Sequence, residues 1–168
     1  MGFFQKLFGG KEENTAKVKE RTVMNIQIDD IVNYDLEDYQ VVSKLTYNDD
    51  GYEWTAYQLL GEKTLWLSVE MDDELEVGMY ESIPKKLSEP LPEKIEHDDV
   101  TYYLDEKGTA RVSGEGRGAN VNNKDCRYFD YCDDEEEHFL SVEIWGSEIE
   151  VSYGFSIEEY EIKIIAGN

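Results

Sequence analysis

Residues 138–145 read HFLSVEIW, and residues 148–153 read EIEVSY. In the first stretch Leu140, Val142 and Ile144 alternate with Ser141 and Glu143, and the second stretch continues the same alternation. Because successive side chains of a β-strand point to opposite faces, this pattern predicts two strands, each with one apolar and one polar face. The intervening Trp-Gly-Ser is typical of a hairpin turn, so the two stretches predict an antiparallel hairpin.

A second hairpin with the same pattern lies earlier in the chain. It is formed by LWLSVEM at 65–71 and ELEVGMY at 74–80. The tetrapeptide LSVE occurs in both hairpins, at 67–70 and 140–143, and is followed by LEV in the first and IEV in the second. Upstream, WTAY at 54–57 and FDY at 129–131 place aromatic residues in a similar way. An identical tetrapeptide with a colinear partner strand favours an internal duplication over chance likeness between acidic amphipathic strands.

The predicted fold is therefore all-β and antiparallel. Two related four-stranded meanders, roughly 38–83 and 98–157, form a barrel or a sandwich. The segment 24–34, MNIQIDDIVNY, favours SH3-like barrel curvature, with a strand expected over Met24 to Ile28. Residues 84–97 contain all three prolines and are interpreted as the connector between the meanders. We expect residues 24–168 to form the body and residues 1–23 a separate arm.

Charge is unevenly distributed along the 168 residues, whose formal net charge is −23. In residues 1–24, five basic and three acidic residues give +2, and the remaining 11 basic and 36 acidic residues give −25. A body this acidic repels phosphate, which argues against nucleic acid as a partner. With no secretory leader after Met1, the two cysteines, Cys126 and Cys132, are expected to be reduced thiols in a cytoplasmic protein.

Several segments taken together resemble a bacterial family known only as domain of unknown function 4178. They are IDDIVNYDLEDYQV, YEWTAYQL, LWLSVE, VTYYLDEKGTARVSGEGRGAN and LSVEIWGSEIEVSYG, which span about residues 24–165. The resemblance implies an all-β domain without an established catalytic activity. It also implies a bacterial stress-response setting, near polyamine-metabolism and membrane proteins. The family has no established functional residues, so none is transferred to this chain.

The stretch SGEGRGANVNN at 113–123 is a candidate ligand loop. Its glycines would let the backbone approach a ligand, and nearby arginines supply the densest positive charge of the body. The alternative is a long hairpin loop whose arginines neutralise neighbouring carboxylates. The candidate residues are Arg111, Gly114, Gly116, Arg117, Gly118, Asn120 and Arg127.

Two tryptophans fall on the polar faces of the predicted strands, Trp66 and Trp145. An exposed aromatic residue on such a face can serve as a ligand or partner platform, although the fold can also cover it. The acidic run DDEEE at 133–137 is interpreted as a solvated hairpin tip rather than a calcium loop. No sequence pattern predicts a metal site, a cofactor or catalysis, so the protein is expected to be non-enzymatic.

The first ten residues, MGFFQKLFGG, predict a short amphipathic helix that forms only against a surface. Its contact residues would be Phe3, Phe4, Lys6, Leu7 and Phe8. The surface could be an anionic membrane, a membrane-associated protein or the protein's own body, and disorder is the remaining alternative.

The leading functional hypothesis is a stress-response interaction module recruited peripherally to membrane. The alternative is a β-barrel that binds a small ligand, a polyamine or an anionic metabolite. The sequence leaves the oligomeric state open.

Overall fold

The structure is a computed structural model that describes residues 20–167. Its secondary structure is almost entirely β, with two short 3-10 helices, η1 and η2. The strands and helices are β1 (Ile31–Tyr34), β2 (Glu37–Asp49), β3 (Tyr52–Leu60), β4 (Thr64–Met71), β5 (Leu75–Ile83), β6 (Lys94–His97), β7 (Val100–Gly116), η1 (Arg117–Val121), β8 (Lys124–Cys132), β9 (His138–Trp145), β10 (Glu148–Ile157), η2 (Glu159–Glu161) and β11 (Ile162–Ile165).

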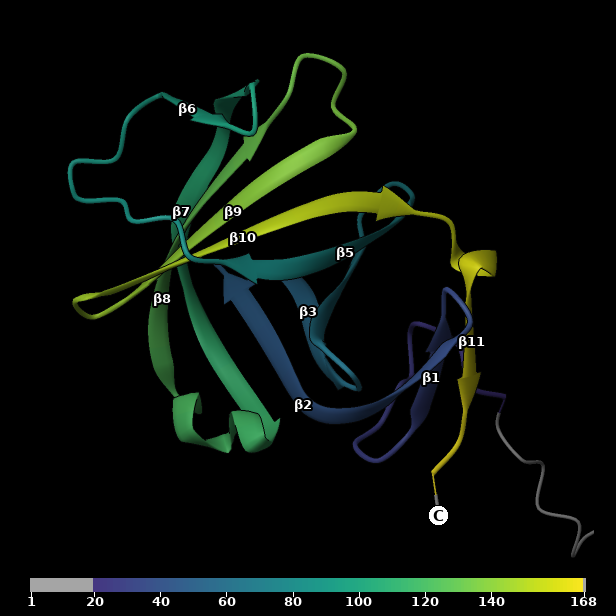
Figure 1. Cartoon of the computed structure of the whole chain (residues 1–168). Coiled ribbons are helices and arrows are strands. Elements are labelled where there is room, and N and C mark those ends of the chain that lie inside the picture. The colour runs from purple at the N-terminus through teal and green to yellow at the C-terminus, as the bar shows by residue number, and fades with distance from the viewer. Residues whose placement is uncertain (1–19, 168) are drawn as a thin grey trace, which may run out of the picture.

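Eight of the strands form a closed antiparallel barrel. The sheet order is β11-β1-β2-β3-β4-β5-β10-β9-β8-β7-β6, and an additional pairing between β2 and β7 closes it. In this closing pairing, residues 43–48 lie opposite residues 111–116. Full closure leaves the eight barrel strands without a free edge. The predicted all-β fold is confirmed in its barrel form, with β1, β6 and β11 added outside the ring (Figure 1).

The two predicted meanders each supply half of the barrel. Strands β2 to β5 cover residues 37–83, and strands β7 to β10 cover residues 100–157. The halves join at two seams, β5 with β10 and β2 with β7. The LSVE tetrapeptides occupy corresponding places, in β4 and in β9, and each is followed by a tight turn into its partner strand. These strands run in opposite directions around the ring, because β4 pairs with β5, β5 with β10 and β10 with β9, each time antiparallel.

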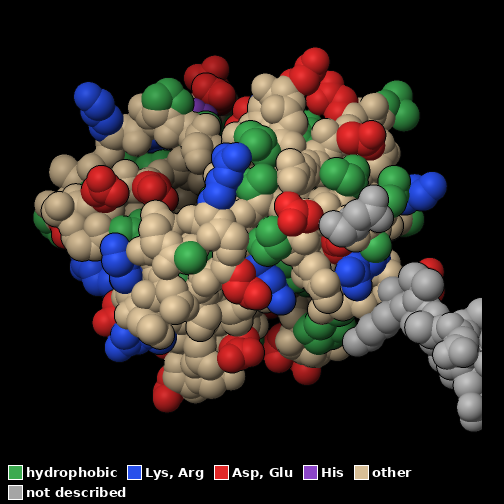
Figure 2. Space-filling view, turned by 90° about the horizontal axis from the view of Figure 1, so that it is seen from below, with side chains coloured by type: hydrophobic (Ala, Val, Ile, Leu, Met, Phe, Trp, Pro, Cys, Tyr) green, Lys and Arg blue, Asp and Glu red, His purple; other side chains and the backbone are tan. Residues whose placement is uncertain are grey.

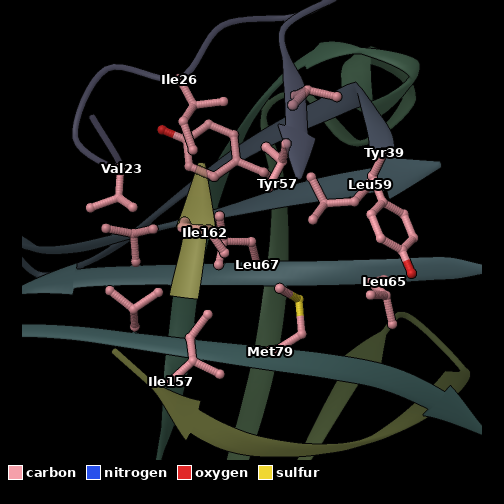
Figure 3. Packing of buried hydrophobic residues seen from close by; sticks show 14 residues of the cluster. Val23, Ile26, Tyr39, Tyr57, Leu59, Leu65, Leu67, Met79, Ile157 and Ile162 are labelled. Carbon is pink, nitrogen blue, oxygen red and sulfur yellow. The ribbon is translucent and has the colours of Figure 1, made fainter. Parts of the chain in front are cut away.

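The apolar face of the first meander lies outside the barrel. Leu67 and Met79 on β4 and β5 are buried there under Val23 and Ile26 of the N-terminal segment and Ile162 of β11. Figure 3 shows these side chains pointing toward one another between the barrel wall and the covering segments. This cluster removes a large apolar surface from water, which is the main favourable contribution to folding.

The apolar face of the second meander is also outside and is covered by the connector. Leu140, Val142 and Val151 pack with Ile95 of β6, and Leu87 and Leu91 of residues 84–97 lie against this cluster. The connector and β6 lie on one side of the barrel, and β1 and β11 lie on the other (Figure 1). Each meander therefore has its own hydrophobic core on the outer surface of the ring.

Both ends of the described chain are fixed by one buried carboxylate. Asp30 is 1% exposed, and its Oδ2 accepts a hydrogen bond from Arg21 Nε at 2.9 Å. Its other oxygen, Oδ1, accepts a hydrogen bond from the Gly167 backbone N–H at 2.9 Å. Residues 24–28, predicted to be a strand, instead form turns that bring Ile26 into the outer core, so that prediction is wrong.

Candidate functional site: the barrel lumen

The polar faces of the strands line the inside of the barrel. They enclose a cavity of about 650 Å³, which is within the size range of small-molecule sites. Five serines contribute to its wall, at positions 43, 68, 82, 141 and 152. Eight-stranded barrels can be filled by their own side chains or can hold one small ligand. Here the small serine side chains leave the centre of the lumen open.

One half of the lumen wall is largely aromatic and apolar. On β2 and β3, Tyr47 and Trp54 stack with ring centroids 5.1 Å apart and an interplanar angle of 4°. Tyr128 of β8 meets Trp54 edge-on at 5.0 Å. Leu45 and Val112 are buried beside these rings. This wall offers flat π-faces and aliphatic surface to anything in the cavity.

All three tryptophans of the sequence line the cavity. Trp66 and Trp145 are half-buried and face the lumen, where both pack against the same interior cluster. The alternation in the sequence placed them on the polar faces, and those faces form the lumen. They are therefore the platform residues of an internal cavity rather than of the outer surface.

Charge in the lumen wall is mainly of one sign. Two basic side chains, Arg117 and Lys124, line the cavity, and both are exposed. Against them stand seven carboxylates: Glu70, Glu106, Asp125, Asp130, Glu143, Glu148 and Glu150. On the outer face in Figure 2, by contrast, acidic and basic side chains are interspersed. The lumen therefore concentrates negative charge in a partly desolvated space.

Glu143 is half-buried in the aromatic side of the lumen. Its side chain accepts hydrogen bonds from the Tyr47 hydroxyl and from Cys126 Sγ, the latter at 3.6 Å. Burial raises the pKa of Glu143 to about 7, with a smaller contribution from the charge of Glu150. The same surroundings raise the pKa of the Cys126 thiol, which keeps it protonated and unsuited to nucleophilic chemistry.

Glu70 and Asp130 behave in the same way. Burial raises the pKa of Glu70 to about 7, and the charges of Glu76 and Glu106 add to the effect. Burial also raises the pKa of Asp130 to about 7, helped by the charges of Glu106, Glu143 and Glu70. The lumen therefore holds three carboxyl groups that are protonated or ionised depending on small changes in pH or on a nearby cation.

Of the candidate ligand loop, one part reaches the lumen and one does not. Arg117, Gly118 and Asn120 belong to η1 or its start and line the cavity at one end. Arg111 forms an ion pair with Asp125 at 3.1 Å, and Arg127 forms one with Glu89 of the connector. Neither arginine lines the cavity: Arg127 lies on the outer side of β8, and Arg111 neutralises Asp125 at the rim of the lumen.

The glycines of this stretch have a packing role. A side chain at Gly114 would collide with the backbone of Gly118, and one at Gly116, whose φ is +64°, would collide with the backbone of Val42. They let η1 fold back closely on β7 and β2 at the end of the barrel (Figure 1). The close packing of η1 on β7 and β2 therefore accounts for the glycines at positions 114 and 116.

Sequence reasoning did not single out the lumen carboxylates. With 39 acidic residues in the chain, no single Asp or Glu stands out by its type. The signal that could have found two of them is the LSVE repeat, because its serine and glutamate alternate with the buried leucine and valine. In both copies these polar residues face the lumen, Ser68 and Glu70 in β4 and Ser141 and Glu143 in β9.

The N-terminal contact residues Phe3, Phe4, Lys6, Leu7 and Phe8 lie outside the described residues. Within residues 20–167, no helix is long and apolar enough to cross a membrane. In the same part of the chain, no group of three or more His, Cys, Asp or Glu side chains is arranged to hold a metal ion. Both cysteines are free thiols.

Comparison with known proteins identifies the family. Residues 27–159 match the family described as Domain of unknown function (DUF4178), which covers most of the chain. The chain belongs to this family, as the resemblance in the sequence predicted. No curated protein and no solved structure matches the chain.

Proposed function

We propose that this protein binds a small organic cation in the lumen of its barrel and that it is a cytoplasmic binding protein rather than an enzyme. Polyamines, the candidates that the sequence suggested, are the leading class. The observation that carries the proposal is the cavity wall, in which seven carboxylates and three tryptophans surround about 650 Å³.

Like charges in the wall support a cationic ligand. Glu70 lies directly opposite Glu76 in the β4–β5 pair, and Glu143 lies opposite Glu150 in the β9–β10 pair. Like charges facing each other across two strands destabilise a sheet. A cation in the lumen would relieve this repulsion, and its binding would lower the pKa of the neighbouring carboxyl groups.

The aromatic wall supports an organic cation over a simple metal ion. A cation over the face of a tryptophan is attracted by the quadrupole of the ring, and the effect grows when water is excluded. Trp54, Trp66 and Trp145 line the cavity and are half-buried, so their rings are within reach of a ligand there. Aliphatic segments of the ligand would pack against the same aromatic surface. A cation with a carbon skeleton would therefore contact both the carboxylates and the aromatic side chains of the lumen.

The anionic metabolite that the sequence also suggested is less compatible with this wall. It would have to approach seven carboxylates with Arg117 and Lys124 as the available basic groups, both at the exposed end of the cavity. Bringing an anion close to these carboxylates is repulsive and raises their pKa values further. The charge of the lumen therefore favours the cation.

Recruitment to an anionic membrane or to a membrane-associated protein, in a stress-response setting, stays a prediction. It depends on the first eight residues, which the structure does not describe, and it is compatible with ligand binding in the barrel.

A thermal-shift titration of the full chain tests the proposal. The probes are 1,4-diaminobutane and the neutral 1,4-butanediol of the same chain length, at pH 8 and 150 mM salt so that long-range attraction is screened. We expect the diamine to raise the melting temperature, because a ligand at a hundredfold excess over its Kd stabilises the folded state by about 2.7 kcal/mol. Butanediol should leave the melting temperature unchanged.

A matched pair of variants separates lumen binding from general attraction to an acidic protein. Glu143→Gln removes one charge from the lumen, and Glu135→Gln removes one from the exposed turn between β8 and β9. The shift caused by the diamine should fall in the first variant and persist in the second. Equal shifts in both variants, or no shift in the native protein, would overturn the proposal.

A further inference from the structure

The two LSVE hairpins place a pair of glutamates in each half of the barrel. Each copy of LSVE places its glutamate opposite a glutamate of the following strand, which gives the pairs Glu70–Glu76 and Glu143–Glu150. The second members, Glu76 and Glu150, occupy the same place in LEV and IEV. The two pairs are therefore equivalent by sequence and by strand register.

The two pairs also have similar surroundings. Glu70 and Glu143 are half-buried, whereas Glu76 and Glu150 are exposed. Each inner glutamate has a serine of its own strand two residues before it on the lumen wall, Ser68 or Ser141. Each pair thus combines one enclosed and one solvated carboxylate.

The pairs lie in different parts of the ring, and three of their members, Glu70, Glu143 and Glu150, line the cavity. Strands β4 and β5 are separated from β9 by β10, and β4 runs opposite to β9. The two copies are consequently related by an approximate two-fold rotation, with the cavity between them. A ligand in the cavity meets Glu70 in one direction and Glu143 with Glu150 in the other.

A further carboxylate lies between the two pairs. Asp130 on β8 lies opposite Ser141 and opposite Glu106 in its two strand pairings. It is close enough to both Glu70 and Glu143 for each of their charges to act on it. Glu70, Asp130 and Glu143 all line the cavity, and the charges of the two glutamates both raise the pKa of Asp130.

We infer that the ligand is a linear cation with an ammonium group at each end and a third ammonium group along its chain, which places one end at Glu70, the other at Glu143 and Glu150, and the middle group at Asp130. This inference rests on the proposed cation-binding function. The methylene segments between the ammonium groups lie against Trp54, Trp66 and Trp145.

A compact cation does not fit this arrangement as well. A single ammonium or quaternary ammonium group would neutralise the carboxylates at one end and leave those at the other end without a cation. The basic groups Arg117 and Lys124 stand at the η1 end of the cavity, which also carries Asp125 and Glu148. Asp125 is also paired with Arg111, so basic groups are concentrated at this end, and Glu70, Glu106, Asp130, Glu143 and Glu150 remain for the ligand.

Isothermal titration of the full chain with three amines tests the inference. The probes are butylamine, 1,4-diaminobutane and the triamine spermidine, at pH 8 and 150 mM salt. We expect affinity to rise about tenfold or more with each added ammonium group, because a hydrogen bond to a charged group is gained at each step. One molecule of the triamine should bind per chain.

The variants Glu70→Gln and Glu143→Gln test the equivalence of the two ends. Each should reduce triamine affinity by a similar factor, about tenfold to a hundredfold. Asp130→Asn should remove the advantage of the triamine over the diamine while diamine binding persists. Glu135→Gln, with the same change of net charge at an exposed turn, should leave all three affinities unchanged.

The outcomes distinguish this inference from the proposed function. Butylamine that binds as tightly as the diamine and triamine would overturn the linear ligand and leave the cation-binding lumen in place. A loss confined to one of the two glutamate variants would show a one-ended site, which also overturns the inference. If no amine binds, both the inference and the proposed function fail.

Discussion

The two faces of the barrel wall differ in what they contribute. The outer face carries two apolar clusters, one sealed by the terminal segments and the other by the connector. The inner face carries serines, carboxylates and tryptophans around an open cavity. The outer clusters contribute stability, and the inner face, in our proposal, contributes recognition. Substitutions on the two faces should have separable effects, and the four predictions below test that separation.

The largest effect on stability is expected on the outer face. Leu140 is fully buried under the connector, and Leu140→Ala removes packed atoms and leaves a space behind. We expect a loss of about 2–5 kcal/mol in the free energy of unfolding, measured by urea denaturation. Lumen contacts are unchanged in this variant, so amine affinity of the folded protein should stay within about twofold. A large change in affinity at full folding would contradict the separation of the faces.

The pH dependence of binding comes next in size. The pKa values of Glu70, Asp130 and Glu143 are raised to about 7, so these groups are largely ionised at pH 8 and protonated at pH 5.5. An alkylammonium ligand stays charged over this range. We expect spermidine affinity to fall by more than about tenfold from pH 8 to pH 5.5, measured by titration calorimetry. A pH-independent affinity would place the ligand away from these carboxylates.

The ionised Glu143 carboxylate in the lumen should lower the stability of the folded protein, and Glu143→Gln should remove this effect. The folded-state pKa of Glu143 is about 7 against an ordinary value of 4.5, so its contribution to stability is present below pH 4.5 and is lost as pH rises through 7. Glu143→Gln should therefore raise stability by about 1 kcal/mol at pH 8 and leave it unchanged at pH 4.5. Thermal unfolding at the two pH values measures this difference. A variant less stable than the native protein at pH 8 would contradict it.

The smallest effect is expected at an arginine on the outer side. Arg127 pairs with Glu89 at the surface, and exposed ion pairs contribute at most about 1 kcal/mol. Arg127→Ala should lower stability by less than that and leave amine affinity unchanged, measured by the same titrations. A marked loss of affinity in this variant would restore Arg127 to the ligand site that the sequence suggested.

The strands and hairpins of the two meanders could be predicted from the sequence because alternation with period two is a local property. LSVE followed by LEV or IEV fixes strand, turn and strand without reference to the rest of the chain. The same alternation cannot say which face is enclosed. That choice depends on the pairing of residues 43–48 with 111–116 and on the segments that cover the outside, both long-range features.

The candidate site could be predicted only in part, because alternation shows which residues share a face but not whether that face is enclosed. Trp66 and Trp145 were placed on the polar faces, but whether those faces meet solvent or a lumen is decided by closure of the ring. Arg111 and Arg127 are close in sequence to Arg117 yet do not line the cavity, because strand parity separates them from the lumen residues. Glu70 and Glu143 were hidden among many carboxylates and became distinctive only when the register placed each opposite a second glutamate.

The seam between β2 and β7 also affects how the protein folds. It joins residues about 70 positions apart in the chain, and contacts between distant residues slow folding because the intervening chain must be ordered first. Each meander can form its hairpins before this seam closes, but the lumen exists only afterwards. A ligand held there cannot speed the early steps of folding. Its effect should instead be a slower opening of the finished barrel, so that occupancy governs the lifetime of the native state rather than the rate at which it is reached.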